Sequence, residues 1–344
     1  MEEMVVEALL FGDRQAQLLA ARQLAQFSTK QRHNIAQKGI IPPLILMLST
    51  SDYEAIEAAL FALLSIAFRS ERLAPCAYFI QAFVWNKILI AKSGAIAVLL
   101  DVLQCENRLL VELGVASLLT LSSCASNKLA IAASGAISLL LELLNSQSNN
   151  SMSLQANLDI LSTLHNLSTC HQVIPSIVSY GGVATSLGLI NLAPESVTEK
   201  AVALLENLVS SSRIALEEAA GTVGAIQCLV EAMEEGSRQC KEHAVAILLQ
   251  VCDSCRDRYR GMILREGAMA ALLQLSVDGT KRARDNAKRL VLLLRDCSNC
   301  SQTTKQPKNI VLLEQTMRQI EQGVGETAGM SVALLEEMIS KLRT

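Results

Sequence analysis

Aromatic residues are scarce in this chain of 344 residues: Phe, Trp and Tyr together make up 3% of it. Rows of aromatic platforms that stack the bases of a nucleic acid are therefore excluded. Proline (6) and glycine (17) are also few, and only 18% of the residues are charged. Glycine and proline are the residues that most often break helices, and both are few here. A chain rich in Leu, Ala, Ile and Ser therefore favours helices over strands.

Neither sign of charge dominates, since the chain has 30 Lys and Arg residues and 33 Asp and Glu residues. This balance lacks the basic excess of a nucleic-acid-binding protein, and we expect no nucleic acid among the partners. Hydrophobic residues make up 51% of the chain, which excludes an intrinsically disordered protein.

Targeting signals and membrane spans are not expected either. The chain opens Met1-Glu2-Glu3, without the basic stretch and apolar run of a signal peptide. The uncharged run from Ile160 to Pro194 contains two histidines and a glycine pair, so it does not supply the ~20 continuous apolar residues of a membrane helix. Ten cysteines in mostly apolar surroundings are typical of reduced thiols, and we expect a cytoplasmic or nuclear protein.

A repeat organises the chain. A glycine followed by two small or branched residues recurs at spacings of 55, 41, 47, 42 and 43 residues. A leucine follows each of these glycines by five residues, and an apolar residue precedes each by four. One stretch, Asn86 to Gly94, is nearly copied by Asn127 to Gly135. The six glycines are Gly39, Gly94, Gly135, Gly182, Gly224 and Gly267.

Each unit predicts three helices. A short helix ends at the glycine, because glycine adopts the left-handed conformation that follows many helix ends. A second helix begins at once, as in Pro42 to Leu48, and a polar turn leads to a longer third helix such as Glu57 to Leu64. That third helix is apolar on more than one face, so neighbouring repeats must cover it. The sequence therefore predicts an all-α, right-handed α-solenoid.

A period of about 42 residues with a Gly-Ala-Ile turn resembles armadillo repeats. The third helix from Lys241 to Cys252, with Glu266-Gly267-Ala268, is similar to the repeats of plant U-box ubiquitin ligases. The resemblance covers residues 1–296 and implies a plant protein that binds other proteins. We expect the U-box itself to be missing, since the repeats begin almost at residue 1. The Trp and Asn ladders of importin-α-like receptors are also missing, since Trp85 lies outside a third helix.

The irregular segments complete the predicted domain plan. We expect a solenoid of six to seven repeats over residues 1–296, a linker over 297–308 and a helical cap or tail over 309–344. Residues 73–85 form an uncharged insertion with four aromatic residues, which is either a docking loop or an extra segment that the fold tolerates. A polar loop around residues 145–151 accounts for the other long spacing.

Catalytic and metal-binding patterns are weak. The pairs Cys252/Cys255 and Cys297/Cys300 have zinc-like spacing, but they fall at equivalent ends of successive third helices, which lie ~8–10 Å apart and do not bring four sulfurs to one ion. His165 and His171 are six residues apart, which is not a spacing that places both on one helix face. We therefore expect no metal, no cofactor and no enzymatic activity.

The function predicted from the sequence is a non-catalytic scaffold that binds an extended or helical segment of a protein partner in the groove made by successive third helices. The alternative is a substrate-recognition component related to U-box ligases. A nuclear-transport receptor is a third, less favoured class. We expect a monomer. The candidate groove residues are Ser65, Thr120, Asn166, Asn207, Gln250, Arg282 and Arg289.

Overall fold

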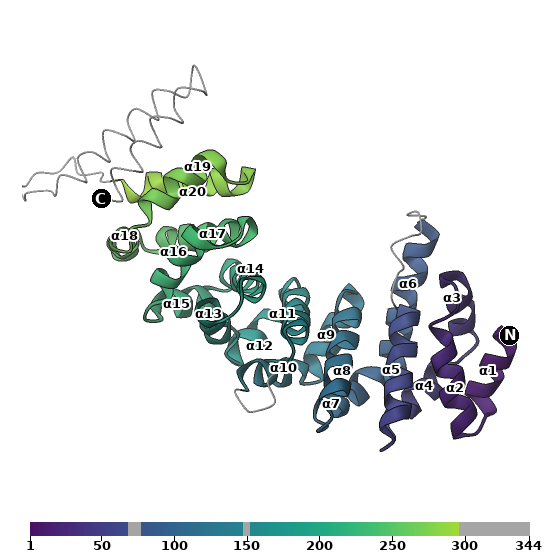
Figure 1. Ribbon diagram of the computed structural model, residues 1–344. Coiled ribbons are helices and arrows are strands. Elements are labelled where there is room, and N and C mark those ends of the chain that lie inside the picture. Colours follow the sequence, from purple (N-terminus) through teal and green to yellow (C-terminus); the bar gives the residue numbers. More distant parts are fainter. Residues whose placement is uncertain (68–76, 147–151, 296–344) are drawn as a thin grey trace, which may run out of the picture. The chain divides into compact units, whose positions relative to one another are not determined.

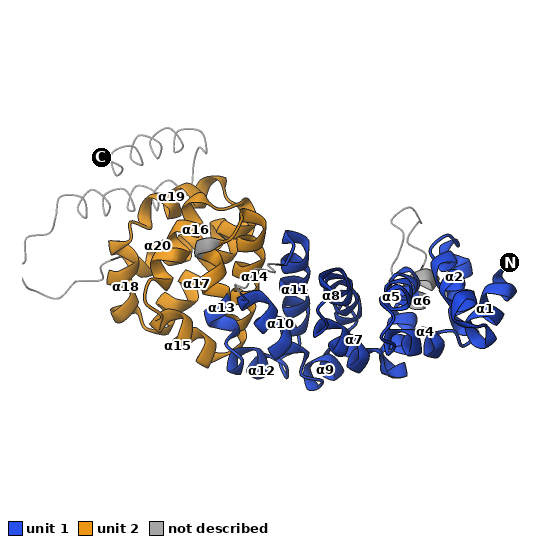
Figure 2. Cartoon of the chain, turned by 60° about the horizontal axis from the view of Figure 1, so that its bottom comes forward, with its two compact units in different colours: residues 1–185 blue, residues 186–344 orange. Residues whose placement is uncertain are grey.

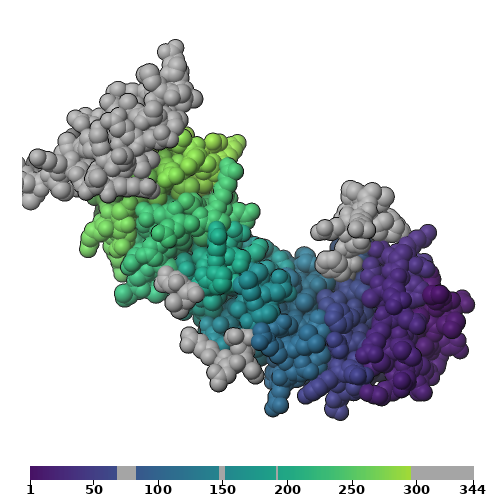
Figure 3. Space-filling model, viewed as in Figure 1, coloured from purple at the N-terminus to yellow at the C-terminus, as the bar shows by residue number. Residues whose placement is uncertain are grey.

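The computed structural model describes residues 1–67, 77–146 and 152–295, and every regular element in those ranges is helical (Figure 1). The chain divides into two compact units, residues 1–185 and residues 186–344 (Figure 2). Figure 3 shows the view of Figure 1 in space-filling form, coloured along the sequence. The all-α repeat architecture predicted from the sequence is confirmed.

Unit 1 opens with an incomplete repeat, α1 (Glu2–Phe11) and α2 (Arg14–Leu24). Complete repeats of a first, a second and a third helix follow. They are α3 (Thr29–Gln37), α4 (Ile41–Leu48) and α5 (Tyr53–Ala67); α6 (Ala77–Ile90), α7 (Ile96–Leu103) and α8 (Arg108–Ser122); and α9 (Ala125–Ala133), α10 (Ala136–Asn145) and α11 (Leu154–Ser168).

The next repeat begins with α12 (Ile174–Ser179) and α13 (Gly182–Leu192), and the boundary between the units lies within α13. Unit 2 continues with the same succession of helices. They are α14 (Glu195–Ser211); α15 (Arg213–Gly221), α16 (Ala225–Glu235) and α17 (Arg238–Ser254); and α18 (Arg256–Arg265), α19 (Met269–Asp278) and α20 (Lys281–Leu294).

The repeat glycines end the first helices in the left-handed conformation, as predicted, with one correction. The fourth such glycine is Gly181 (φ 86°), not Gly182. Gly182 instead starts α13 in close contact with Ile177, where an added Cβ would lie 2.5 Å from a side-chain carbon. With Gly181 as the reference, Ile177 takes the buried position four residues before the glycine, and it is fully buried.

The nearly copied stretches make copied contacts. Asn86 Nδ2 donates to the Ile66 carbonyl at 3.1 Å, and Asn127 Nδ2 donates to the Lys87 and Leu121 carbonyls at 3.1 and 3.2 Å. Both asparagines are buried. They bind carbonyls in or near the last turns of helices, where fewer backbone donors are available. The repeated asparagine therefore fastens each first helix to the preceding repeat.

The described part of the insertion is helical, whereas the docking-loop alternative had no helix there. Residues 77–85 are helical and extend α6, so α6 has 14 residues whereas α3 has 9. Its apolar residues run directly into the repeat sequence that follows, and no glycine or proline separates them. Val84 and Trp85 are exposed on this extension. Residues 73–76 lie outside the described residues, as do 297–308 and 309–344 and most of the polar loop.

One helical stretch in the described part of the chain, Phe83–Leu103, is long and apolar enough to cross a membrane by length and composition. The stretch is 39% buried and contains Gly94 with φ 92°, which breaks its regular helical geometry. A single such helix is weak evidence for a membrane span, because core helices of soluble proteins pass the same test.

Candidate protein-interaction face

The third helices of each unit pack side by side, and their register can be counted from the residue that precedes each helix, here called the cap residue. In α5 to α20 the cap residues are Asp52, Asn107, Ser153, Pro194, Ser237 and Thr280. Asn107, Ser153, Ser237 and Thr280 accept hydrogen bonds from backbone N–H groups of the first turn through their side chains. Such caps satisfy donors that the helix leaves unpaired.

Carboxylates hold this register from one repeat to the next. A glutamate five residues after a cap residue binds the following cap: Glu112 accepts from the Ser153 N–H at 3.0 Å, and Glu199 accepts from the Ser237 hydroxyl at 2.5 Å. Glu242 accepts from the Thr280 hydroxyl in the same way. Sequence reasoning missed this link, although acidic residues at one position of successive repeats were a visible signal.

Five of the predicted groove residues lie at one position of the register. Each follows its cap residue by thirteen residues, and each is partly exposed. They are Ser65, Thr120 and Asn166 in unit 1, and Asn207 and Gln250 in unit 2. The structure therefore gives each unit a row of polar side chains on its third helices.

The polar row is partly bound within the protein. Asn166 Nδ2 donates to Ser122 Oγ at 3.0 Å, and Gln250 Nε2 donates to Ser210 Oγ at 2.9 Å. Thr120 lines a small apolar cavity between α5 and α8. Gln250 lines a shallow cavity of about 480 Å³ at the C-terminal ends of α14 and α17. These contacts fix the amides while leaving part of each side chain at the surface.

One turn before the polar row, nine residues after the cap, small side chains dominate. They are Ala116 and Ser162 in unit 1, and Ala203 and Ala246 in unit 2. Phe61 occupies this position in α5 and is 46% exposed. Arg22 of α2 and Ala116 of α8 take this position on the two helices that pack beside α5. An exposed aromatic side chain is the kind of residue that anchors a protein partner. Sequence reasoning did not single out Phe61, because its neighbours in the sequence are apolar and the whole segment was expected to be buried.

The remaining two predicted residues, Arg282 and Arg289, lie elsewhere on α20. Arg289 falls at the small-residue position and approaches Asp253 at 3.9 Å, while Leu293 takes the polar-row position. Arg282 points back along the stack and pairs with Glu206 of α14 and Glu242 of α17. Burial acts to lower the pKa of Arg282, but the two carboxylates outweigh it and raise the pKa above its usual value.

Glu206 is the centre of this cluster. Its side chain is 6% exposed and accepts a hydrogen bond from His243 Nδ1 at 2.6 Å as well as from Arg282. In α5, α8 and α17 the same register position holds Leu64, Leu119 and Leu249. A buried carboxylate in place of leucine needs its two partners, since an unpaired buried charge is costly. The cluster thus ties three third helices together.

Acidic groups also meet in unit 1. Burial raises the pKa of Asp159 on α11, and the negative charge of Glu112 on α8 raises it further. Burial likewise acts to raise the pKa of Glu112, but hydrogen bonds from Ser153 and Arg108 outweigh it and leave this pKa below its usual value. The carboxylates of Glu112 and Asp159 therefore lie near each other on the third helices α8 and α11, and Arg108 is the cation paired with Glu112.

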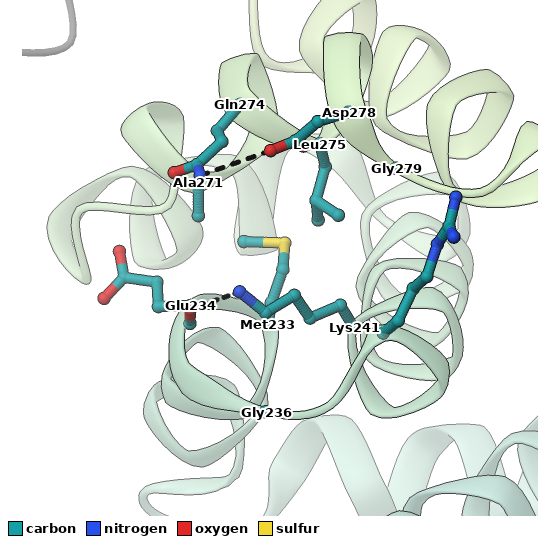
Figure 4. A pocket seen from close by; sticks show the side chains of 10 residues that line it. Met233, Glu234, Gly236, Lys241, Ala271, Gln274, Leu275, Asp278 and Gly279 are labelled. Atoms are coloured by element: carbon teal, nitrogen blue, oxygen red, sulfur yellow. Dashed lines mark hydrogen bonds between the residues drawn. The ribbon is translucent and has the colours of Figure 1, made fainter.

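A third cavity, of about 320 Å³, lies in unit 2 between the turn from α16 to α17 and the helix α19 (Figure 4). Lys241 Nζ crosses it to donate to the Glu234 carbonyl at 2.6 Å, as Figure 4 shows. Gln274 and Asp278 form its other wall. Within the described residues, no cluster of three or more His, Cys, Asp or Glu side chains could hold a metal ion.

Comparisons with known proteins agree with this geometry. The chain matches the plant U-box protein ARM repeat region over residues 92–310. It is 31% identical to U-box domain-containing protein 45 of Arabidopsis thaliana over 44% of the chain, and 35% identical to U-box domain-containing protein 17 of the same plant over 42%. Each match spans only 19% of the relative's own length.

Solved structures show the same fold. An engineered protein is similar over 99% of this chain and 78% of its own, with a TM-score of 0.72 and 20% identity. A designed armadillo repeat protein, solved in complex with the peptide (KR)4, is similar over 84% of this chain and 98% of its own, with a TM-score of 0.50 and 17% identity. The resemblance stated from the sequence is confirmed. The chain belongs to the plant U-box protein ARM repeat family.

Proposed function

We propose that this chain is a non-catalytic scaffold that binds an extended or helical segment of a protein partner on its third-helix face. The observation that carries the proposal is the shared register of the polar row and the small residues one turn before it. Small side chains let the backbone of a ligand approach the helices. The side-chain amides of Asn166 and Gln250, which are held in place by serine hydroxyls, can bind the N–H and C=O groups of that backbone. The ARM family to which the chain belongs supports an interaction role.

In unit 1, Phe61 supplies the anchor of the proposed face. Its exposed ring lies one turn before Ser65 on α5. The acidic groups of α8 and α11 are on the third helices that follow, so they favour a partner segment with basic residues next to an apolar one. Arg22 of α2 pairs with Glu54 at 3.9 Å and is exposed at the same register position as Phe61.

The test is affinity purification followed by mass spectrometry on the full chain and two matched variants. Phe61→Glu places a charge on the third-helix face, whereas Leu46→Glu places one on α4 of the same repeat, where Leu46 is 69% exposed. We expect Phe61→Glu to lose partners that Leu46→Glu retains. Equal partner sets for the two variants would show that the third-helix face is not the binding surface.

A second function is favoured by the relatives, which are U-box domain-containing proteins. In this alternative the chain recognises substrates for ubiquitination while another component performs the transfer. An in vitro assay with ubiquitin, activating enzyme and conjugating enzymes separates the possibilities. Transfer by the purified chain alone would contradict the non-catalytic proposal; ubiquitination of its captured partners only when a ligase is added would support the alternative.

A further inference from the structure

The outer face of α20 departs from the pattern of every third helix before it. Eight residues after the cap, the described third helices α5 to α17 carry residues that are at most 1% exposed. They are Leu60, Val115, Leu161, Val202 and Val245. At this position α20 has Lys288, which is exposed. Eleven residues after the cap, each of these five helices has a buried leucine, whereas α20 has the partly exposed Val291.

Lys281, Arg284 and Lys288 define this outer face together with Val291 and Leu292. The three cations are exposed and make no ion pair with any other described residue. The opposite side of α20 is apolar and buried through Ala283, Ala287, Leu290 and Leu294. The outer face is therefore amphipathic. It carries positive charge at a position where the earlier third helices present an aliphatic side chain to the next repeat.

The end of α20 is held firmly in this orientation. Arg256 Nε and Arg260 Nε of α18 donate to the carbonyls of Leu293 and Leu294 at 2.5 and 2.8 Å. These carbonyls belong to the last turn, which has no intrahelical donors. The last turn of α20 is thus fixed against α18, which lowers the cost of ordering this end of the outer face when an occupant binds.

The chain continues for 49 residues beyond the described part, and its sequence offers a complementary segment. Residues 309–322 place Ile310, Leu313, Met317 and Ile320 at helical spacing. Glu314 and Glu321 flank that apolar stripe and are seven residues apart, as are Lys281 and Lys288. Seven residues of α-helix rise about 10.5 Å, so the two pairs of charges match in spacing.

We propose that residues 309–322 dock on the outer face of α20, with Glu314 and Glu321 paired to Lys281 and Lys288 and the apolar stripe covering Val291 and Leu292. This contact closes the stack with a segment of the same chain. It goes beyond the proposed function, because it involves neither the polar row nor the position one turn before it. Solenoids need such closure, since a terminal repeat otherwise exposes the face that its neighbours bury.

Hydrogen exchange measured by mass spectrometry on the full chain tests this contact. We expect slow amide exchange in 309–322, and a roughly threefold to tenfold faster exchange in Lys281→Glu/Lys288→Glu, since each exposed pair contributes little alone. Glu314→Lys/Glu321→Lys should have the same effect, and the fourfold variant that swaps both pairs should restore protection. Lys30→Glu/Lys38→Glu, which reverses two exposed lysines of unit 1, is the control.

Two results would overturn the proposal. One is exchange in 309–322 that does not change when Lys281 and Lys288 are reversed, or that is not restored by the charge swap. The other is protection that disappears on dilution, which would assign the outer face to a second copy of the chain. Protection that is independent of concentration and restored by the swap supports docking within one chain.

Discussion

Replacing Arg282 by Met removes the guanidinium that reaches from α20 to Glu206 while keeping most of the side chain's apolar length. Glu206 is then left with His243 as its partner in a site where its side chain is 6% exposed. Losing one partner of a buried charge costs the desolvation that the partner had offset. We expect Arg282→Met to lower the free energy of unfolding of unit 2 by about 2–3 kcal/mol.

The companion variant Glu206→Leu separates this explanation from a general loss of packing. Leucine is the residue that α5, α8 and α17 carry at this register position. Arg282 is half-exposed and still has Glu242 at 3.3 Å, so it does not become a buried unpaired charge. We therefore expect Glu206→Leu/Arg282→Met to be less destabilised than Arg282→Met alone, because replacing both members of a buried pair by apolar groups is often neutral.

Urea unfolding followed by circular dichroism measures the three variants, and hydrogen exchange in α14, α17 and α20 assigns the effect to unit 2. Repeat proteins can unfold in more than one step, so the local measurement is needed. An Arg282→Met variant within about 0.5 kcal/mol of the wild type would refute the reasoning, as would a double variant whose loss equals the sum of the single losses.

Three further outcomes are expected. Gly135→Ala should lower stability by about 1–2 kcal/mol in thermal unfolding, because φ is 88° there and an added Cβ meets nothing, so only backbone strain acts; an unchanged Tm would contradict this. Asn127→Leu should cost about 2 kcal/mol in the same measurement, since the Lys87 and Leu121 carbonyls each lose a hydrogen bond from this buried amide, whereas Asn157→Leu on α11 should cost less. Burial raises the pKa of Cys228 and Cys240 to about 11, so iodoacetamide at a pH of about 8 should label exposed Cys255 before either of them. Labelling of the two buried thiols should become faster as the pH rises toward 11, and labelling of Cys228 as fast as that of Cys255 at a pH of about 8 would contradict their burial.

The repeat and its helices could be predicted from the sequence because the same pattern recurs in six repeats. Each time, a glycine has an apolar residue four positions before it and a leucine five positions after it. The fourth glycine shows where this pattern was ambiguous. Gly181 and Gly182 are adjacent, and either gives a plausible spacing, so only the backbone angle distinguishes the one that must be left-handed. The buried Ile177 then falls where the other repeats have Ile35, Ile90 and Ile131.

The insertion and the contacts of Arg282 were beyond sequence reasoning for different reasons. Residues 77–85 contain nothing that favours a helix over a loop taken alone, and they are helical because they continue into α6. Arg282 meets Glu206 across 76 residues, a contact that depends on how far each repeat is displaced from the next. Which residues of the third-helix face bind a partner stays a prediction.

The links between repeats are short in sequence, and this bears on how the chain is made. Ser153 to Glu112, Ser237 to Glu199 and Thr280 to Glu242 span 41, 38 and 38 residues. A nascent polypeptide can complete each link as soon as one more repeat has emerged from the ribosome, so structure can grow from the N-terminus without waiting for the rest. Arg282 and Glu206 meet only after two repeats have been added, and their pairing marks the completion of the last stretch of the stack.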